Sequence, residues 1–321
     1  MYKKMNKKQR YCYLDNLGGL LICYMIFNHV LLMDQIDCGI DNIWLEPLQF
    51  FMFWFFFKSG MFYTPKNCKL IIAHESRKLL KPLLVYSLVG HVVECFKLCA
   101  NGDYNWKHYL LTPLKEFLLN GSVVGNQPLW FLFSLFFVKL IYNELYQWKF
   151  KPALLFCIGC AVSAILFYVN IEGLPIYFAN IPLGIGIYSL GYMMREWQFN
   201  KVVLLLSFIL YLGIMVICPS HLIFGANSLN KGGCYVFAIV YSVAGCIFFN
   251  NLFIKIPNCT ILQFVGKNSM TYYVVHWIVI NICWLFLIIV YPVSGVIVFS
   301  VMSMSSFIIP TIIVNLKSRI R

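Results

Sequence analysis

Charged residues are scarce in this 321-residue chain: Asp, Glu, Lys and Arg make up 12% of it, against 61% hydrophobic residues and a mean hydropathy of +0.76. This shortage excludes a soluble globular protein, because no interior of that size hides so much apolar surface. Long hydrophilic stretches and Pro/Gly/Ser-rich linkers are also missing, which argues against an appended soluble domain. We therefore expect one integral-membrane domain over residues 1–321.

Ten apolar stretches approach the length of membrane-spanning helices, which need roughly twenty mostly apolar residues each. They lie at 16–33, 48–63, 79–100, 129–146, 153–170, 181–194, 202–218, 234–250, 271–290 and 294–315. The stretch at 181–194 is the shortest. We therefore expect an all-α, polytopic bundle of about ten transmembrane helices.

Acidic residues are fewer than basic ones: 12 Asp and Glu stand against 25 Lys and Arg, and the formal net charge is +13. The placement of the cations argues against nucleic acid as a partner, because they fall in alternate segments between the apolar stretches. One set of segments carries Lys3, Lys4, Lys7, Lys8, Arg10, Lys66, Lys69, Arg77, Lys78, Lys81, Lys149, Lys151, Arg195, Lys201, Lys255, Lys267, Lys317, Arg319 and Arg321. The other set carries most of the acids. This positive-inside pattern predicts that both termini are cytoplasmic.

Two familiar signals are incomplete. The amino terminus is basic and then apolar but lacks a small-residue cleavage site, so we expect it to be retained as the first helix. Cys157 and Cys160 form a CxxC on one helical face, but two further ligands are missing nearby. We interpret these cysteines as small apolar side chains, and we expect no metal site and no bound cofactor.

His29 lies near the far end of the first apolar stretch, roughly 20 Å from the cytoplasmic end of its helix. An ionisable side chain at that depth indicates a functional site, and the alternative is a neutral imidazole satisfied inside the bundle. Asp15 lies nearly four turns earlier on the same helix face, too far away to touch His29. A cytoplasmic donor that reacts at His29 must therefore arrive on a thin, extended carrier.

Positive charge is concentrated before the third apolar stretch, where Lys66, Lys69, Arg77, Lys78 and Lys81 follow one another closely. Such a cluster is typical of positive-inside topology and of attraction to anionic membrane lipids. It also suits a phosphate-binding patch, because Arg and Lys at a helix start pair well with phosphate oxygens. The two interpretations are compatible.

Three further features leave alternatives open. His91 and Glu94 sit one turn apart, where they either satisfy one another or serve in catalysis or proton transfer. His276 lies five residues into its apolar stretch, on the cytoplasmic side, and its neighbours do not decide its role. Between residues 101 and 128, apolar residues recur at three and four positions, which indicates a helix on the membrane surface or over a cavity, or else a connecting loop.

Five segments in a fixed order carry a pattern that extends over nearly the whole chain. They are LDNLGG at 14–19 leading to Asn28 and His29, FKSG at 57–60, RKLLKP at 77–82, PLWFL at 128–132 and GKNSMTYYVVH at 266–276. Together they resemble the signatures of the acyltransferase 3 family of integral-membrane acyltransferases. Lys81 stands where that family commonly has Arg. The family's basic residue eleven positions before the histidine falls at Gly18, so either Lys58 or Arg77 from another helix replaces it or the site is incomplete.

The resemblance implies a membrane O-acyltransferase, most simply an O-acetyltransferase, that uses acyl-CoA as co-substrate. Its acceptor would be a hydroxyl of a cell-envelope glycan or lipid-linked sugar, at the cytoplasmic (inner) membrane of a bacterium. For catalysis we expect His29, as general base, and Asp15. For binding of the acyl-CoA donor we expect Arg77, Lys78, Lys81 and Ser59. We expect three further residues in the same site, Ser269, His276 and Glu94.

Two other functions fit part of the pattern. Many spans with a few buried ionisable residues also describe a transporter or flippase for a lipid-linked glycan. The ordered segments favour the enzyme, as does the lack of visible repeat symmetry and of paired Gly/Pro-broken helices. A family member that binds acyl-CoA or a partner without turnover would account for Gly18.

Overall fold

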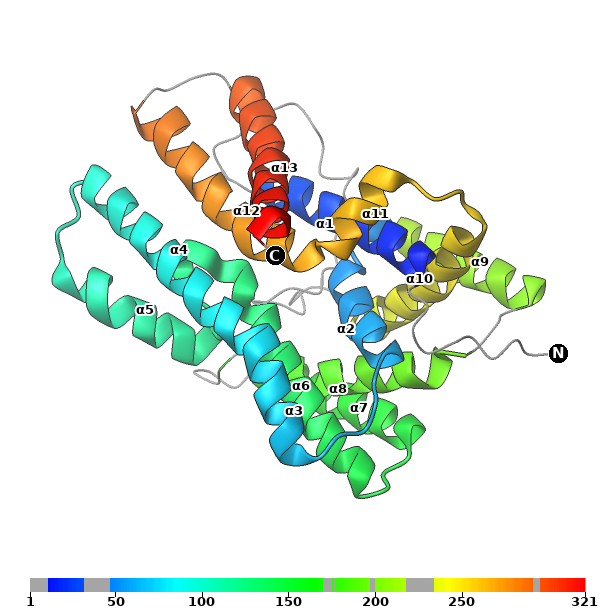
Figure 1. Ribbon diagram of the computed structural model, residues 1–321. Coiled ribbons are helices and arrows are strands. Elements are labelled where there is room, and N and C mark those ends of the chain that lie inside the picture. The colour runs from blue at the N-terminus through cyan, green and yellow to red at the C-terminus, as the bar shows by residue number, and fades with distance from the viewer. Residues whose placement is uncertain are drawn as a thin grey trace.

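The computed structural model describes residues 11–31, 47–169, 175, 177–196, 200–217, 234–290 and 295–320. These residues are almost entirely helical and include no strand. The main helices are α1 (Cys12–Leu31), α2 (Phe51–Met61), α3 (Cys68–Glu75), α4 (Lys81–Ala100), α5 (Trp106–Asn120), α6 (Trp130–Gln147), α7 (Pro152–Val169), α8 (Tyr177–Met194), α9 (Lys201–Ile217), α10 (Tyr235–Lys255), α11 (Thr260–Lys267), α12 (Ser269–Trp284) and α13 (Gly295–Ile320) (Figure 1). Shorter segments are η2 (Ser76–Leu80), η3 (Val124–Leu129) and η5 (Leu285–Val290).

The predicted all-α bundle is confirmed. Each of the ten apolar stretches overlaps a described helix. Among the described residues, seven helical stretches are long and apolar enough to cross a membrane; α2, α8 and α9 are not among them. The number of spans and the side of each terminus therefore stay predictions.

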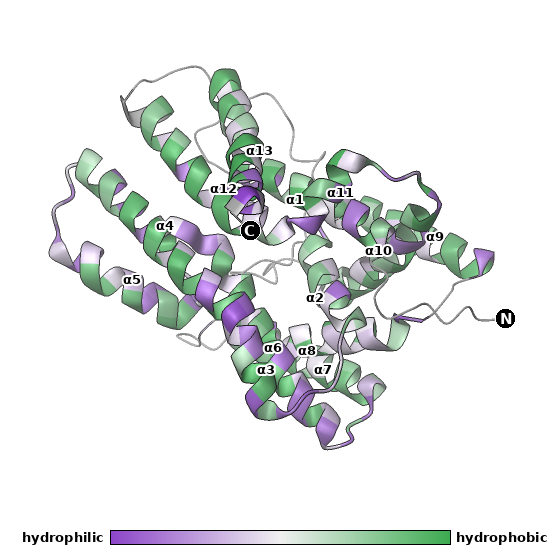
Figure 2. Ribbon diagram, viewed as in Figure 1, coloured by the Kyte–Doolittle hydropathy of each residue, from purple (hydrophilic) through white to green (hydrophobic). Residues whose placement is uncertain are grey.

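The outer surface of the bundle is apolar, as a protein surrounded by lipid requires. Leu88 of α4, Ile165 of α7 and Leu205 of α9 are each at least 59% exposed. Figure 2 shows hydrophobic residues along the outer helices, with hydrophilic ones gathered mainly near helix ends and on parts of α3, α5 and α6. The outward apolar faces of these helices thus suit contact with lipid rather than burial against other helices.

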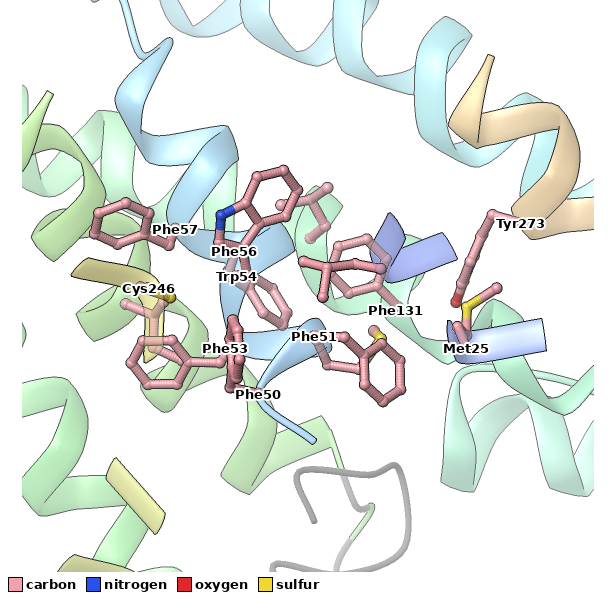
Figure 3. Close-up of a cluster of buried hydrophobic side chains, with 14 of the residues drawn as sticks. Met25, Phe50, Phe51, Phe53, Trp54, Phe56, Phe57, Phe131, Cys246 and Tyr273 are labelled. Carbon is pink, nitrogen blue, oxygen red and sulfur yellow. The ribbon is translucent and has the colours of Figure 1, made fainter. Parts of the chain in front are cut away.

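The short helix α2 forms the centre of the bundle and contacts α1, α8 and α10. Its aromatic side chains fill the core (Figure 3). Trp54 also donates a hydrogen bond from Nε1 to Asn250 Oδ1 of α10 at 2.9 Å. Glycines let α2 and α8 touch through their backbones: a Cβ on Gly60 would overlap the carbonyl oxygen of Tyr188, and one on Gly191 that of Phe57. Such small-residue crossings are a usual means of helix association in membranes.

The segment between α4 and α6 differs in part from its prediction. Residues 106–120 form the helical alternative, α5, which ends at Gly121 in the left-handed conformation (φ 70°). The chain then enters the bundle as η3, which neither a surface helix nor a connecting loop predicts. Gly125 touches the backbone of Gly90 in α4, and buried Asn126 donates to the carbonyl of Val274 in α12. Irregular backbone is tolerated at this depth because protein satisfies its polar groups.

Candidate active site

His29 and His276 meet inside the bundle. The Nδ1 of His29 lies 2.8 Å from the Nε2 of His276, and the two rings are nearly parallel at 12°. Trp277 packs edge-on against His29 with ring centroids 5.3 Å apart. Two helices far apart in the sequence, α1 and α12, therefore supply one histidine pair.

The hydrogen bonds of His276 assign the tautomers of both rings. Its Nδ1 lies 2.8 Å from the carbonyl oxygen of Tyr273 and 3.2 Å from that of Tyr272. A carbonyl only accepts, so we assign the proton of neutral His276 to Nδ1, which leaves its Nε2 as an acceptor. His29 must then donate from Nδ1, and its own Nε2 carries a free lone pair. That nitrogen is the basic atom of the pair.

His276 is deeper in the bundle than its sequence position suggested. It contacts His29, which is seventeen residues beyond the start of α1, although it is only the eighth residue of α12. The reason is α11, which packs against the beginning of α1: a Cβ on Gly266 would overlap the carbonyl oxygen of Asp15. The helix α12 therefore begins beside the middle of α1.

A cavity of about 470 Å³ lies between α1, α2, α3, α6 and α12. Three of the residues that the sequence assigns to the site line it: Ser59, Lys78 and Ser269. Arg77 and Lys81 are exposed beside Lys78 and do not line it. The basic cluster is thus divided: Lys66 and Lys78 line the cavity, whereas Arg77 and Lys81 do not.

The cavity is positively charged. Four lysines line it, Lys58, Lys66, Lys78 and Lys139, against the single carboxylate of Glu75. Glu75 accepts from Lys139 Nζ at 2.8 Å and lies 2.8 Å from His74 Nδ1. Glu75 balances Lys139, and Asp15 lies 3.9 Å from the ammonium of Lys58, so Lys66 and Lys78 remain in excess of the carboxylates at the described cavity. An anionic ligand fits this charge.

Lys139 was missed by the sequence analysis. It lies in the middle of an apolar stretch, and it reaches the cavity because α6 packs against α3 and η2. An ionisable residue inside a span marks a site by default, and that criterion identifies Lys139 as readily as His29.

Lys58 occupies the space beside Gly18. A Cβ on Gly18 would lie 3.2 Å from the Nζ of Lys58, which donates to the carbonyl of Leu14 at 3.2 Å. The same ammonium lies 3.9 Å from Asp15 Oδ1 and 5.0 Å from the ring centre of Trp54. Of the two predicted replacements for the missing basic residue, Lys58 is the one at this position.

Asp15 is buried near the start of α1 and pairs with Lys58. It does not approach His29, as its position fourteen residues earlier predicts; the two lie about 21 Å apart along the helix. In this structure Asp15 forms an ion pair with Lys58, whose side chain lines the cavity.

Tyr273 joins the cavity to the histidine pair. Its buried ring lines the cavity, and its carbonyl accepts from His276 Nδ1 at 2.8 Å. Neither histidine lines the cavity itself. Tyr273 precedes His276 by three positions on α12, which corresponds to about 4.5 Å of helix rise.

Glu94 lies in a second polar cluster, on the far side of the histidine pair from the cavity lysines. It pairs with Lys97 at 3.3 Å instead of with His91, which lies 3.6 Å from Cys95 Sγ. Lys97 also donates to Asn281 Oδ1 at 3.1 Å and lies 4.8 Å from the ring centre of Trp284. Asn281 follows His276 by five residues on α12, so the cluster lies about 7.5 Å further along that helix.

The described residues contain no group of three or more His, Cys, Asp or Glu side chains that could hold a metal ion. Cys157 is exposed and Cys160 half-buried in α7, both as free thiols.

The fold and these sites define an integral-membrane helix bundle with a hydrogen-bonded histidine pair beside a positively charged cavity. A family model described as an acyltransferase domain, that of the acyltransferase 3 family, matches residues 12–315, and the chain belongs to this family. Comparison with curated proteins and with solved structures gives no match. Membership implies a membrane acyltransferase and thereby favours the enzyme over the transporter.

Proposed function

We propose that this protein transfers an acyl group, most simply acetyl, from acyl-CoA to a hydroxyl of a cell-envelope glycan or lipid-linked sugar. The observation that carries the proposal is the hydrogen-bonded pair of His29 and His276, about one helix turn beyond a positively charged cavity. The tautomers assigned above leave Nε2 of His29 available as a base. A positioned imidazole is the usual general base for a hydroxyl nucleophile.

The cavity is the proposed donor site. Lys66 and Lys78 suit the phosphates of CoA, because ammonium groups form charge-assisted hydrogen bonds with phosphate oxygens. The narrow pantetheine arm would pass Ser59 and Ser269 toward Tyr273, which brings the thioester to the histidine pair. Lys58 would support this path from the cavity wall, and Asp15 would hold Lys58 in place from behind.

The chemistry needs one base that later acts as an acid. His29 Nε2 takes the proton of the acceptor hydroxyl while the hydroxyl oxygen attacks the thioester carbonyl. When the carbon–sulfur bond breaks, the thiolate of CoA leaves and receives that proton from the His29 imidazolium. The products are the ester and free CoA, and the bond from His29 Nδ1 to His276 Nε2 is kept throughout.

The acceptor would approach from the side of Glu94 and Lys97, opposite the donor lysines. With the termini in the cytoplasm, as the positive-inside pattern predicts, that side faces outward. We place the protein in the cytoplasmic membrane of a bacterium, where acyl-CoA is available inside and envelope glycans outside.

The test of this function is release of CoA thiol from acetyl-CoA by the purified protein in nanodiscs. We expect release that depends on an added sugar acceptor and stops when the acceptor is omitted. A transporter, or a family member that binds without turnover, would release no thiol with any acceptor, and that result would exclude the proposal.

The divided basic cluster gives a prediction about the donor. Lys78→Gln is expected to weaken binding of acetyl-CoA by about tenfold, because a hydrogen bond to a charged group contributes about 1.5 kcal/mol or more. Lys81→Gln removes the same charge three residues away, outside the cavity, and is the matched control with a smaller loss. Isothermal titration with CoA in detergent measures both; equal losses would show that the cluster acts only as a diffuse positive surface.

A further inference from the structure

A second cavity lies on the bundle surface between α9 and α10 and shares no residue with the donor cavity. Its volume is about 290 Å³. The helix α9 contributes Lys201, Leu204, Leu205 and Phe208, which are spaced as one face of a helix. We call this cavity the α9–α10 groove.

The partner helix contributes the same pattern in reverse order. Phe248, Asn251, Leu252 and Lys255 of α10 line the other wall. The rings of Phe208 and Phe248 lie 4.8 Å apart and close one end of the groove. The other end carries both ammonium groups, because Lys201 begins α9 and Lys255 ends α10.

The groove separates charge from apolar surface along its length. Each lysine is seven positions from the phenylalanine on its own helix, which corresponds to about 10 Å of helix rise. None of the eight described residues that line it is acidic, and within the described part of the chain neither lysine has a carboxylate partner. Within the described residues, two ammonium groups without a carboxylate partner therefore lie at one end of the groove, and the rest of its lining is mainly apolar. We call this apolar part the apolar slot.

The surroundings of the groove are those of a lipid-facing surface. Val202, Leu206 and Ile209 of α9 are 54% to 63% exposed and flank its wall. Both lysines lie in segments that the charge pattern assigns to the cytoplasmic boundary of the membrane. A ligand with an anionic head at the boundary and an apolar tail in the bilayer matches both ends.

We propose that the α9–α10 groove binds one anionic glycerophospholipid, with its phosphate between Lys201 and Lys255 and an acyl chain over Phe208 and Phe248. Basic pockets between membrane helices on the cytoplasmic side commonly hold anionic headgroups. The positively charged group of a zwitterionic lipid is repelled by the two lysines. We therefore expect the groove to prefer lipids with a net negative charge over zwitterionic ones.

The test is native mass spectrometry of the protein released from nanodiscs made of equal parts phosphatidylglycerol and phosphatidylcholine. Wild-type protein is expected to retain phosphatidylglycerol preferentially. The variant with Lys201→Gln and Lys255→Gln is expected to lose about thirtyfold of this preference, since each surface lysine contributes roughly five- to sixfold. The variant with Lys317→Gln and Arg319→Gln removes equal charge at the end of α13 and is expected to behave as wild type.

Three results of this comparison would each overturn the proposal, and a fourth comes from a phosphate control. The three are an unselective wild-type protein, an unchanged preference in the Lys201 and Lys255 variant, and an equal loss in the Lys317 and Arg319 variant. Inorganic phosphate added before release is expected to leave the retained lipid unchanged, because the apolar slot holds the acyl chain. Displacement by inorganic phosphate would show a free-phosphate site instead of a lipid site.

Discussion

His29→Ala is expected to lower acyl transfer by about a hundredfold to ten-thousandfold, the usual cost of a lost general base. Binding of acetyl-CoA should be unchanged, because His29 does not line the donor cavity and makes no contact with its lysines. Thiol release per folded molecule measures the first quantity, and titration with CoA measures the second. The split between them separates a chemical role from a packing role.

His91→Ala is the matched control for this prediction. His91 is a second half-buried histidine of the bundle, on α4, and its ring contacts Cys95 away from the pair. We expect its replacement to leave turnover per folded molecule near that of wild type. His276→Ala is no control, because His276 bonds directly to His29. Normal turnover per folded molecule in His29→Ala would contradict the proposed role of His29 as general base.

His276→Phe is expected to reduce kcat by on the order of a hundredfold while the KM for acetyl-CoA stays unchanged. Outer partners that fix the tautomer of a functional histidine typically have effects of this size. Phenylalanine fills the same space but accepts no hydrogen bond, so His29 is free to rotate and to move its proton to Nε2. Steady-state kinetics in nanodiscs measures both parameters.

His276→Gln distinguishes positioning from packing. Its amide oxygen can accept from His29 Nδ1, so we expect it to retain more activity than His276→Phe at equal amounts of folded protein. His276 would then be a positioning residue that acts through His29. Equal losses in the two variants, or a loss that follows the amount of folded protein, would contradict this role.

The sequence predicted the elements of the fold better than their relative placement. Helices over all ten apolar stretches follow from hydrophobic length, and α5 from its apolar spacing. The inward course of η3 did not follow, because it depends on a backbone contact between Gly90 and Gly125, and local pattern does not encode contacts between distant glycines.

In the candidate site, likewise, single residues could be identified from the sequence, but the contacts between them could not. His29 and the lysine cluster stood out as ionisable residues in or next to apolar stretches. The partnership of His29 with His276 was not predicted, because it depends on α11 shifting the start of α12 along α1. Likewise, Gly18 reads as a missing charge in the sequence, whereas the fold brings Lys58 from α2 into its place.

The protonation state of His29 can be observed directly by ¹⁵N NMR of the protein labelled at histidine, with its signals assigned by their loss in His29→Ala and His276→Phe. The account predicts neutral rings near pH 8, with Nδ1 protonated and Nε2 unprotonated in both His29 and His276. This is the pattern that Tyr273 imposes through its carbonyl. A protonated Nε2 on His29 would leave that atom unable to accept the proton of an acceptor hydroxyl, and would contradict the proposed catalysis.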